Sequence, residues 1–159
     1  MKQSSIAIVG AGQIGGRHLQ ALCHLEGPAR IDLVDPSGES LQIARNRYEE
    51  VISPGKQGIE LHCHHSLDDL PDSLDLVIIA TNSVVREKVI RDVTKKCSVK
   101  NLILEKILFQ RKVQYIEVDK FLKESSVPAW VNCWMRAADL FKQIKSDLDL
   151  SYPIQIKVD

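Results

Sequence analysis

The amino-acid sequence predicts an α/β fold, a doubly wound and mainly parallel β-sheet with helices on both faces. Short apolar runs rich in Val, Ile and Leu alternate with longer amphipathic stretches, which is the pattern of consecutive βαβ units. Several of these runs are apolar on both faces, as expected for strands buried in a parallel sheet. A cluster of glycines lies between the first apolar run and the first amphipathic stretch. Together these observations place the chain in the α/β class.

Short apolar runs are the predicted strands. In chain order they are SIAIVG, IDLVD, IELHC, LDLVIIA, NLILEK and PAWVNC. Each is bounded by polar or glycine-containing segments. Because right-handed crossovers return consecutive strands in the same direction, we expect these runs to lie side by side in one parallel sheet.

Four amphipathic stretches between these runs are the predicted helices. They are GRHLQALCHLEG, SGESLQIARNRYEEV, SVVREKVIRDVTKKC and QRKVQYIEVDKFLKES. In the third stretch, valines recur at nearly every fourth residue with charges between them, the spacing of an amphipathic helix. Ser37 and Ser83 can cap the second and third helices. Gly27, followed by Pro28, predicts the end of the first helix.

Composition and charge narrow the class of protein. A chain of 159 residues is one domain or slightly more. Its 21 Lys and Arg residues balance its 21 Asp and Glu residues, which argues against bulk nucleic-acid binding. The sequence has neither a signal-peptide pattern nor an apolar run of the ~20 residues that a membrane helix needs. We therefore expect a cytoplasmic protein with no nucleic-acid or membrane partner.

The glycine cluster fits the motif G-x-G-x-x-G at Gly10, Gly12 and Gly15. The first glycine allows a tight turn, the second lets the backbone approach a pyrophosphate, and the third lets helix and strand pack closely. The N-terminus of the following helix offers free N–H groups and a partial positive charge to the phosphates. We therefore expect a Rossmann-type domain that binds a dinucleotide cofactor, with Gln13 and Ile14 also at the cofactor.

A second signal for a dinucleotide is the acidic residue that ends the next predicted strand. Asp35 lies twenty residues after Gly15, where a carboxylate can accept hydrogen bonds from the adenosine ribose hydroxyls. The same carboxylate would repel a 2′-phosphate, so NAD is favoured over NADP. An ordinary glycine turn with a helix-capping aspartate is the alternative, and the coincidence of motif, position and spacing argues against it.

The segment HCHH has the composition of a metal site, but its predicted conformation argues against one. Adjacent side chains of a strand point to opposite faces. His62 and His64 should therefore share one face, and Cys63 and His65 the other. Two ligands on each face do not complete a tetrahedral zinc site, so we expect no metal. We also expect His18 to be a packed histidine of the first helix.

Several segments, in order and spacing, resemble the Gfo/Idh/MocA oxidoreductases, the family of glucose–fructose oxidoreductase and inositol dehydrogenase. These segments are VGAGQIGGRHLQAL, LVDP, VIIATNSVVREKVI, LILEKIL and VNCWMRAADLFKQIKSDL. The resemblance implies an NAD(P)-dependent oxidoreductase that moves a hydride between nicotinamide and a carbonyl or secondary alcohol. It also implies that the partner is a small-molecule substrate, a sugar, polyol or related metabolite.

The same resemblance implies which residues form the catalytic end of the site. The family's E-K-P motif, whose lysine lies near the nicotinamide and substrate, matches Glu105 and Lys106. Lys106 is therefore the expected catalytic residue, because an amine there can hydrogen-bond or protonate the substrate oxygen as charge develops. An arginine of the closing segment, near the substrate in many members, matches Arg136.

The family's A-T-P turn, which contacts the nicotinamide half of the cofactor, matches Ala80, Thr81 and Asn82. Three residues depart from the family pattern. Asn82 replaces the proline of this turn, Ile107 replaces the proline of E-K-P, and Arg86 replaces a histidine. The loss of two prolines frees the backbone of both loops.

The predicted domain organisation is a nucleotide-binding domain over residues 1–150, followed by the first strand or linker of a substrate domain over 151–159. Because the resemblance places part of the substrate site in that second domain, we expect the isolated chain to bind cofactor without turning over substrate.

Two alternatives to an oxidoreductase domain stay open: a non-catalytic NAD(H)-binding regulatory module, which would not need Glu105 and Lys106, and a shortened remnant. The oligomeric state, including a homo-oligomer, is also open. Trp130 is expected in the core near the domain boundary.

Overall fold

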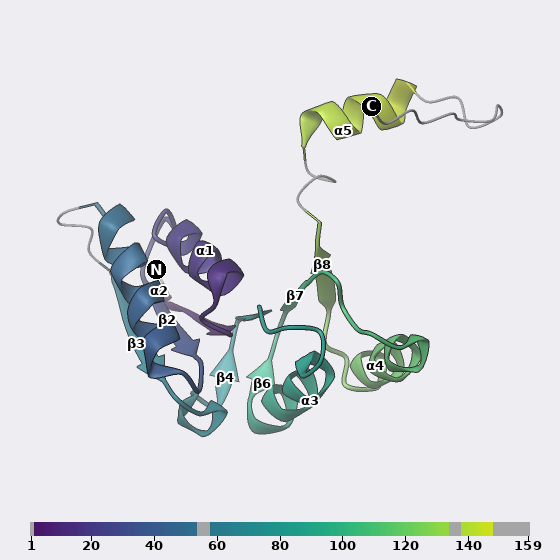
Figure 1. The fold of residues 1–159 in the computed structure, drawn as a ribbon, viewed down its shortest axis with the longest axis horizontal. Coiled ribbons are helices and arrows are strands. Elements are labelled where there is room, and N and C mark those ends of the chain that lie inside the picture. The colour runs from purple at the N-terminus through teal and green to yellow at the C-terminus, as the bar shows by residue number, and fades with distance from the viewer. Residues whose placement is uncertain (1, 54–57, 134–137, 148–159) are drawn as a thin grey trace.

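The computed structural model describes residues 2–53, 58–133 and 138–147. Its centre is a six-stranded sheet in the order β3-β2-β1-β5-β7-β8 (Figure 1). All neighbouring strands in this sheet are parallel. The strands are β1 (Ser4–Val9), β2 (Ala29–Val34), β3 (Ile59–His64), β5 (Leu76–Ile79), β7 (Leu102–Glu105) and β8 (Ala129–Asn132). The six predicted strands and the doubly wound order, which runs outward from β1 in both directions, are confirmed.

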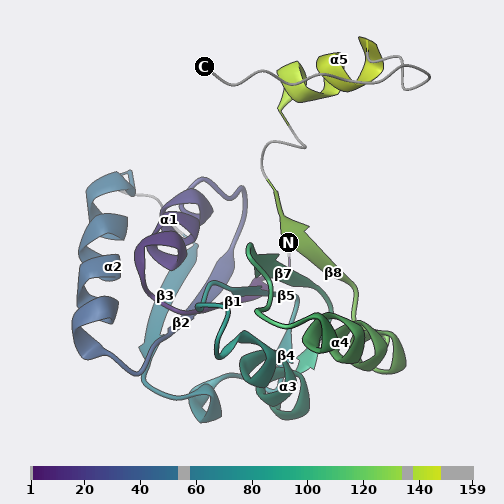
Figure 2. The same ribbon diagram turned by 45° about the vertical axis from the view of Figure 1, so that its right-hand side comes forward.

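Helices cover both faces of the sheet, as predicted. The helices are α1 (Gln13–Leu22), α2 (Gly38–Val51), α3 (Arg86–Lys96), α4 (Lys112–Glu124) and α5 (Asp139–Asp147). Figure 2 shows α1 and α2 on one face of the sheet, and α3 and α4 on the other. A 3₁₀ turn, η1 (Leu67–Asp69), and a two-stranded parallel sheet of β4 (Ser73–Leu74) and β6 (Ser98–Val99) were not predicted.

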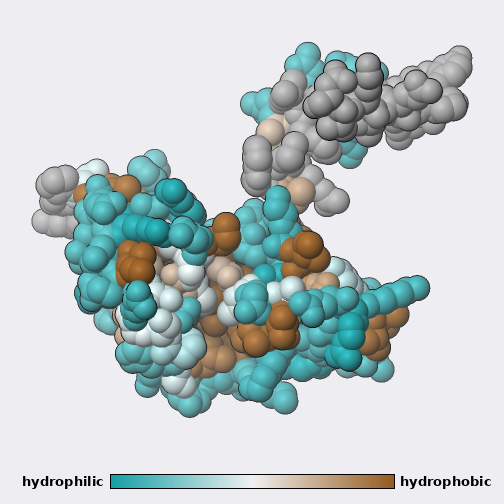
Figure 3. Space-filling view, viewed as in Figure 1, coloured by the Kyte–Doolittle hydropathy of each residue, from teal (hydrophilic) through white to brown (hydrophobic). Residues whose placement is uncertain are grey.

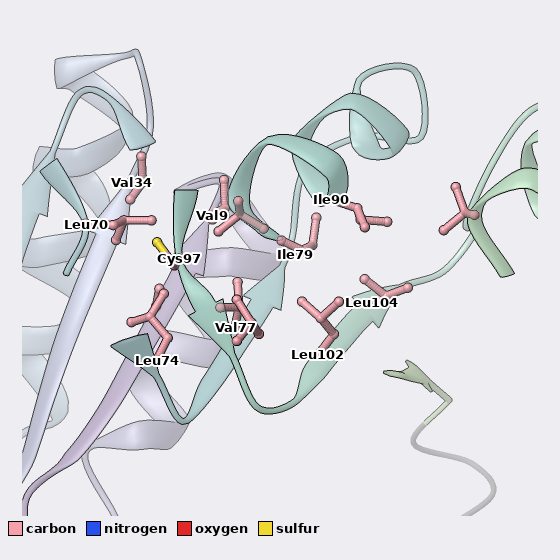
Figure 4. Packing of buried hydrophobic residues seen from close by; sticks show 14 of the residues in the cluster. Val9, Val34, Leu70, Leu74, Val77, Ile79, Ile90, Cys97, Leu102 and Leu104 are labelled. Carbon is pink, nitrogen blue, oxygen red and sulfur yellow. The ribbon is translucent and has the colours of Figure 1, made fainter. Parts of the chain in front are cut away.

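Two apolar cores, one on each face, hold these layers together. Adjacent strand residues point to opposite faces, so Ile8 and Ile78 pack under α1 and α2, whereas Val9 and Val77 pack under α3 and α4. Figure 4 shows the second core, in which side chains from four sheet strands meet α3. Burial on both faces explains why the central strands are continuously apolar in sequence.

The ends of two helices differ from the sequence-based predictions. Ser37 caps α2 as predicted, because its hydroxyl accepts a hydrogen bond of 3.2 Å from the N–H three residues later. Ser83 does not cap α3. Instead, Asn82 Oδ1 accepts hydrogen bonds of 3.0 and 3.3 Å from the N–H groups two and three residues later. Helix α1 ends at Leu22, five residues before the predicted stop at Gly27.

Strand β8 lies at the edge of the sheet, and its side chains are largely outside the core. Trp130 is 56 % exposed, so its predicted place in the core is wrong. Position 130 pairs with Ile103 of β7 on one side, and among the described residues no further strand of the sheet follows β8 in the spatial order. Because an edge strand receives packing from only one neighbouring strand, an apolar residue there can remain exposed.

A buried ion cluster joins β2 and β3. Asp32 is fully buried and accepts two hydrogen bonds of 2.9 Å from Arg30. Its Oδ1 also lies 2.7 Å from His64 Nε2. The rings of His62 and His64 stack with centroids 6.4 Å apart, which confirms that these histidines share one face of β3.

The described parts of the chain contain no group of three or more His, Cys, Asp or Glu side chains that could hold a metal ion. Cys23, Cys63, Cys97 and Cys133 are free cysteines. Among the helices of the described ranges, none has the length and apolar character needed to cross a membrane.

The Asp32 cluster predicts a specific loss of stability in acid. Burial acts to raise the pKa of Asp32, but the hydrogen bonds from Arg30 and His64 outweigh it and the net pKa lies below its usual value. The stability that the Asp32 carboxylate adds to the folded state is therefore fully present above its unfolded-state pKa of about 4. This stability is lost as the pH falls through the lower pKa of Asp32 in the folded state.

We expect Asp32→Asn to lower the free energy of unfolding at pH 7 by about 3 kcal/mol. The difference from wild type should shrink as the pH falls from 5 to 2. Urea unfolding followed by circular dichroism across this range measures both effects. Asp119→Asn, which removes an exposed carboxylate 63 % accessible to solvent, is the control and should change little. A deficit in Asp32→Asn that does not vary with pH would contradict the charge-based account.

Candidate functional site

The glycine-rich turn brings the N-terminus of α1 to the carboxyl end of β1. Gly10 has a φ of +103°, a conformation that residues with a side chain rarely adopt. A Cβ atom at Gly10 would also lie 2.9 Å from the backbone nitrogen of Thr81. The tight turn predicted for the first glycine therefore exists, and it places β1 against the loop that follows β5.

The other two glycines of the motif have opposite surroundings. A Cβ atom at Gly15 would lie 1.7 Å from the carbonyl oxygen of Gly10, so helix and strand are in direct backbone contact. A Cβ atom at Gly12 would meet nothing within 4 Å. Gly12 is the N-cap of α1, and the open space therefore lies where the free N–H groups of the helix point.

Asp35 follows β2 and faces the glycine-rich turn. Its Oδ2 accepts a hydrogen bond of 2.8 Å from the Ala11 N–H, and its Oδ1 accepts one of 2.9 Å from the Ser37 N–H. These two bonds fix the carboxylate at the mouth of a cavity of about 720 Å³. The cavity is lined on one side by Val9, Gly10, Val34, Asp35 and Pro36, and on the other by residues 65–68 and by side chains of α3.

A second cavity of about 380 Å³ lies at the same edge of the sheet. Its walls are the start of α1, the loop after β5 and the loop after β7. Its lining residues are Gly12, Gln13, Ile14, Ala80, Thr81, Asn82, Ser83, Arg86, Glu105, Lys106 and Ile107. Thr81 lines both cavities, so the two adjoin there. Figure 3 shows neutral and hydrophobic surface in the hollow between the two pairs of helices, bordered by hydrophilic side chains.

The buried carboxylate of Glu105 ties three elements together below the second cavity. Its Oε1 lies 2.7 Å from His18 Nε2 of α1 and accepts a hydrogen bond of 2.5 Å from Asn132 Nδ2 of β8. Glu105 is 6 % exposed. The sequence predicts only a packing role for His18, and the structure adds this contact with Glu105. Glu105 and His18 are 87 residues apart, so no local pattern could have indicated it.

Lys106 and Arg86 have contrasting environments beside this carboxylate. Lys106 is exposed and lines the second cavity. Arg86 is 3 % exposed, and its guanidinium donates to backbone carbonyls of both loops, including those of Thr81 and Glu105. Burial lowers the pKa of Arg86, and the nearby Glu105 charge opposes that effect.

The structure thus brings together nearly all of the residues predicted for the site. The residues of the glycine motif, Asp35, the loop Ala80–Asn82 and the pair Glu105–Lys106 lie at the carboxyl edge of the sheet around two adjoining cavities. Gly15 makes the close contact behind them. Arg136, the predicted substrate residue, and the predicted strand 151–159 lie outside the described residues.

Two features of these cavities fit a bound dinucleotide. At Gly12, the helix N-terminus faces space that a side chain would fill. Within the part of the chain that the structure describes, the buried Thr81 hydroxyl has no hydrogen-bond partner. Because buried polar groups are nearly always paired, a donor or acceptor on a ligand spanning the two cavities would complete this site.

Comparison with known protein families agrees with this geometry. The family model described as "Oxidoreductase family, NAD-binding Rossmann fold", that of Gfo/Idh/MocA, matches residues 4–133. The chain belongs to the Gfo/Idh/MocA oxidoreductase family. The matched segment contains every described residue of the candidate site. A comparison with curated proteins gives no match.

Solved structures of Gfo/Idh/MocA and related enzymes share the fold. A Gfo/Idh/MocA family oxidoreductase from Vibrio cholerae has a TM-score of 0.70 and 19 % identity, over 91 % of this chain and 43 % of its own. The UDP-N-acetylglucosamine 3-dehydrogenase GnnA from Acidithiobacillus ferrooxidans has a TM-score of 0.69 and 15 % identity, over 92 % of this chain and 42 % of its own. The WlbA dehydrogenase from Chromobacterium violaceum, in complex with NADH and UDP-GlcNAcA, has a TM-score of 0.64 and 21 % identity, over 82 % of this chain and 35 % of its own. The chain therefore spans less than half the length of these enzymes.

The two glycine environments predict opposite consequences of the same substitution. Gly12→Val should leave the fold intact, because the added side chain enters open space, but should abolish NADH binding by filling the space that the pyrophosphate needs. Gly15→Val should lower the free energy of unfolding by about 3 kcal/mol, because the side chain collides with the Gly10 backbone.

Circular dichroism during thermal unfolding and calorimetric titration with NADH separate the two effects. Each variant is the matched control of the other, since the substitution is identical and the positions are three residues apart. Normal NADH binding by a folded Gly12→Val protein would show that the phosphate site lies elsewhere.

Proposed function

We propose that this chain is the cofactor-binding domain of an NAD-dependent oxidoreductase acting on a carbonyl or secondary alcohol of a sugar-like metabolite. The observation that carries the proposal is the open helix N-terminus at Gly12. The glycine-rich turn there lines the cavity with the fixed carboxylate through Gly10 and the cavity with the exposed lysine through Gly12. A dinucleotide has a matching order of groups: adenosine, pyrophosphate and nicotinamide riboside.

The adenosine half is assigned to the larger cavity. Asp35 there would accept hydrogen bonds from the ribose hydroxyls, and Val85 and Val89 of the α3 side provide apolar wall. The pyrophosphate would lie against the N–H groups at the start of α1, beside Gly12, where the helix dipole favours negative charge.

The nicotinamide half is assigned to the smaller cavity, beside Lys106. When bound, nicotinamide supplies the hydride chemistry. The lysine ammonium can donate a hydrogen bond or a proton to the substrate oxygen on which charge develops. Thr81, whose hydroxyl is buried and unpaired among the described residues, is assigned to the cofactor. The alternative function, a module that only senses NAD(H), gives no reason for the exposed Lys106 in the smaller cavity.

The substrate class rests on the family and on its solved members. The WlbA structure contains UDP-GlcNAcA, and GnnA is a UDP-N-acetylglucosamine 3-dehydrogenase. Both extend well beyond the matched segment. We infer a sugar-like substrate whose site needs more than this domain, with residues 1–150 holding the cofactor, Arg136 contributing near the substrate, and residues 151–159 beginning a substrate domain.

We predict that this chain binds NADH at least about tenfold more tightly than NADPH, because a 2′-phosphate would meet the Asp35 carboxylate. Asp35→Asn should narrow that ratio by removing the charge while keeping an acceptor for the Ala11 N–H. Calorimetric titration of both proteins with both cofactors is the measurement. Equal or tighter binding of NADPH by wild type would overturn the assignment and direct attention to Lys95 and Lys96, which line the same cavity.

We also predict that the 159-residue chain does not oxidise or reduce substrate although it binds cofactor. Lys106 is exposed at one wall of an open cavity, and an acid–base group without a positioned substrate is a weak catalyst. NADH formation and consumption are assayed across sugars, polyols and keto acids, with Lys106→Ala as control. Robust turnover that disappears in Lys106→Ala would show that this domain suffices. In a longer form that carries a substrate domain, Lys106→Ala should lower kcat by about a hundredfold or more.

A further inference from the structure

Arg86 occupies an unusual position for an arginine in the first turn of a helix. It is 3 % exposed, although α3 borders an open cavity. Its guanidinium donates to backbone carbonyls that are distant from one another in sequence. The acceptors are the carbonyl oxygens of Thr81, Glu105, Ile107 and Leu108, the last at 3.2 Å.

Thr81 belongs to the loop after β5, and the other three acceptors belong to the last residue of β7 and the loop that follows it. A buried cation is costly unless its donors are satisfied. Here backbone carbonyls accept from both terminal nitrogens, whereas the buried Nε has no partner among the described residues. A guanidinium presents its donors as a planar fork, so one side chain can reach several carbonyls at once. Moving either loop would strip partners from a buried charge. The two loops are therefore locked to each other through Arg86.

The locked backbone is the part that carries the nicotinamide end of the proposed site. Arg86 holds the carbonyls of Glu105 and Ile107, the residues on either side of Lys106. The Lys106 side chain itself remains exposed in the second cavity. Arg86 thus fixes the base of this side chain and leaves its ammonium group free.

The residues in these loops do not supply such rigidity by themselves. Neither Asn82 nor Ile107 is a proline, so no ring fixes φ at either position. Ile107 is 74 % exposed, so apolar packing does not hold it in place. The hydrogen bonds from Arg86 join the Ile107 segment to the Thr81 segment, and one longer bond of 3.5 Å from Gln110 Nε2 to the Ser83 hydroxyl also links the two loops.

We propose that Arg86 is a positioning residue that holds Lys106 and the loop after β5 in the arrangement needed to bind the nicotinamide half of the cofactor. This inference rests on the proposed function, because it assigns that half to the second cavity. It separates the two ends of the site: Arg86 should matter for nicotinamide binding and not for adenosine binding.

Arg86→Lys tests this separation, because a single ammonium nitrogen cannot span two loops. Dissociation constants for NADH and for ADP, which lacks the nicotinamide riboside, are measured by calorimetry. We expect NADH binding to weaken about tenfold or more and ADP binding to change less than about twofold. The increase in nicotinamide fluorescence on binding should be lost as well. Arg91→Lys is the matched control on the same helix, where Arg91 pairs with Glu87 and lies over the ring of Phe121 of α4, and it should change neither constant.

The outcomes distinguish this inference from the proposed function. Failure of the wild-type chain to bind NADH would defeat the proposed function itself. If wild type binds both ligands and Arg86→Lys weakens them equally, or weakens neither, the proposed function stands and the role of Arg86 is overturned.

A measurement on the wild-type protein covers the case in which Arg86→Lys does not fold. The Nε–H resonance of Arg86 in a ¹⁵N-labelled sample should shift when NADH is added and should stay in place when ADP is added. An unchanged resonance with saturating NADH would overturn the proposal.

Discussion

Backbone contact between α1 and β1 at Gly15 is the constraint on which the site depends. A Cβ atom on residue 15 would lie only 1.7 Å from the carbonyl oxygen of residue 10. The helix can therefore approach the strand only because residue 15 is glycine. This approach aims the helix N-terminus along the carboxyl edge of the sheet. It also leaves Gly12 beside open space, so the same turn that packs the helix creates room for a phosphate group.

The rest of the site consists of loops fixed relative to that edge by polar contacts. Asp35 is tied to the turn through the Ala11 N–H. Glu105 is tied to α1 through His18 and to β8 through Asn132. Arg86 ties the loops after β5 and β7 together. Because these contacts are buried or partly buried, each carries more weight than a surface pair would, and the edge can stay ordered without a continuous apolar lining.

Features set by local sequence could be predicted, and features set by distant contacts could not. The strands follow from apolar runs, and the roles of Gly10, Gly12 and Gly15 follow from what each backbone position must accommodate. The alternation of His62 and His64 follows from strand geometry alone. Accordingly, the doubly wound parallel sheet agrees with the sequence-based expectation, and most residues of the predicted site lie at one edge of that sheet.

The missed features depend on chain segments that meet only after folding. Arg86 in a first helical turn gives no sign of burial, since its carbonyl acceptors reach up to 22 residues away. Trp130 is apolar enough for a core but lies on an edge strand, a fact that needs the strand order. Asn82, and not Ser83, accepts hydrogen bonds in the turn before α3, and α3 itself begins without a side-chain cap. The burial of Arg86 and the exposure of Trp130 are matters of tertiary placement, whereas Ser83 is a local error at the start of a helix.

A crystal structure of this chain grown with NAD⁺ would locate both ends of the cofactor. We expect the pyrophosphate beside Gly12 at the start of α1, the adenosine ribose on Asp35, and the nicotinamide beside Lys106. A cofactor bound at another edge of the sheet, or bound with its two ends exchanged between the cavities, would contradict this placement.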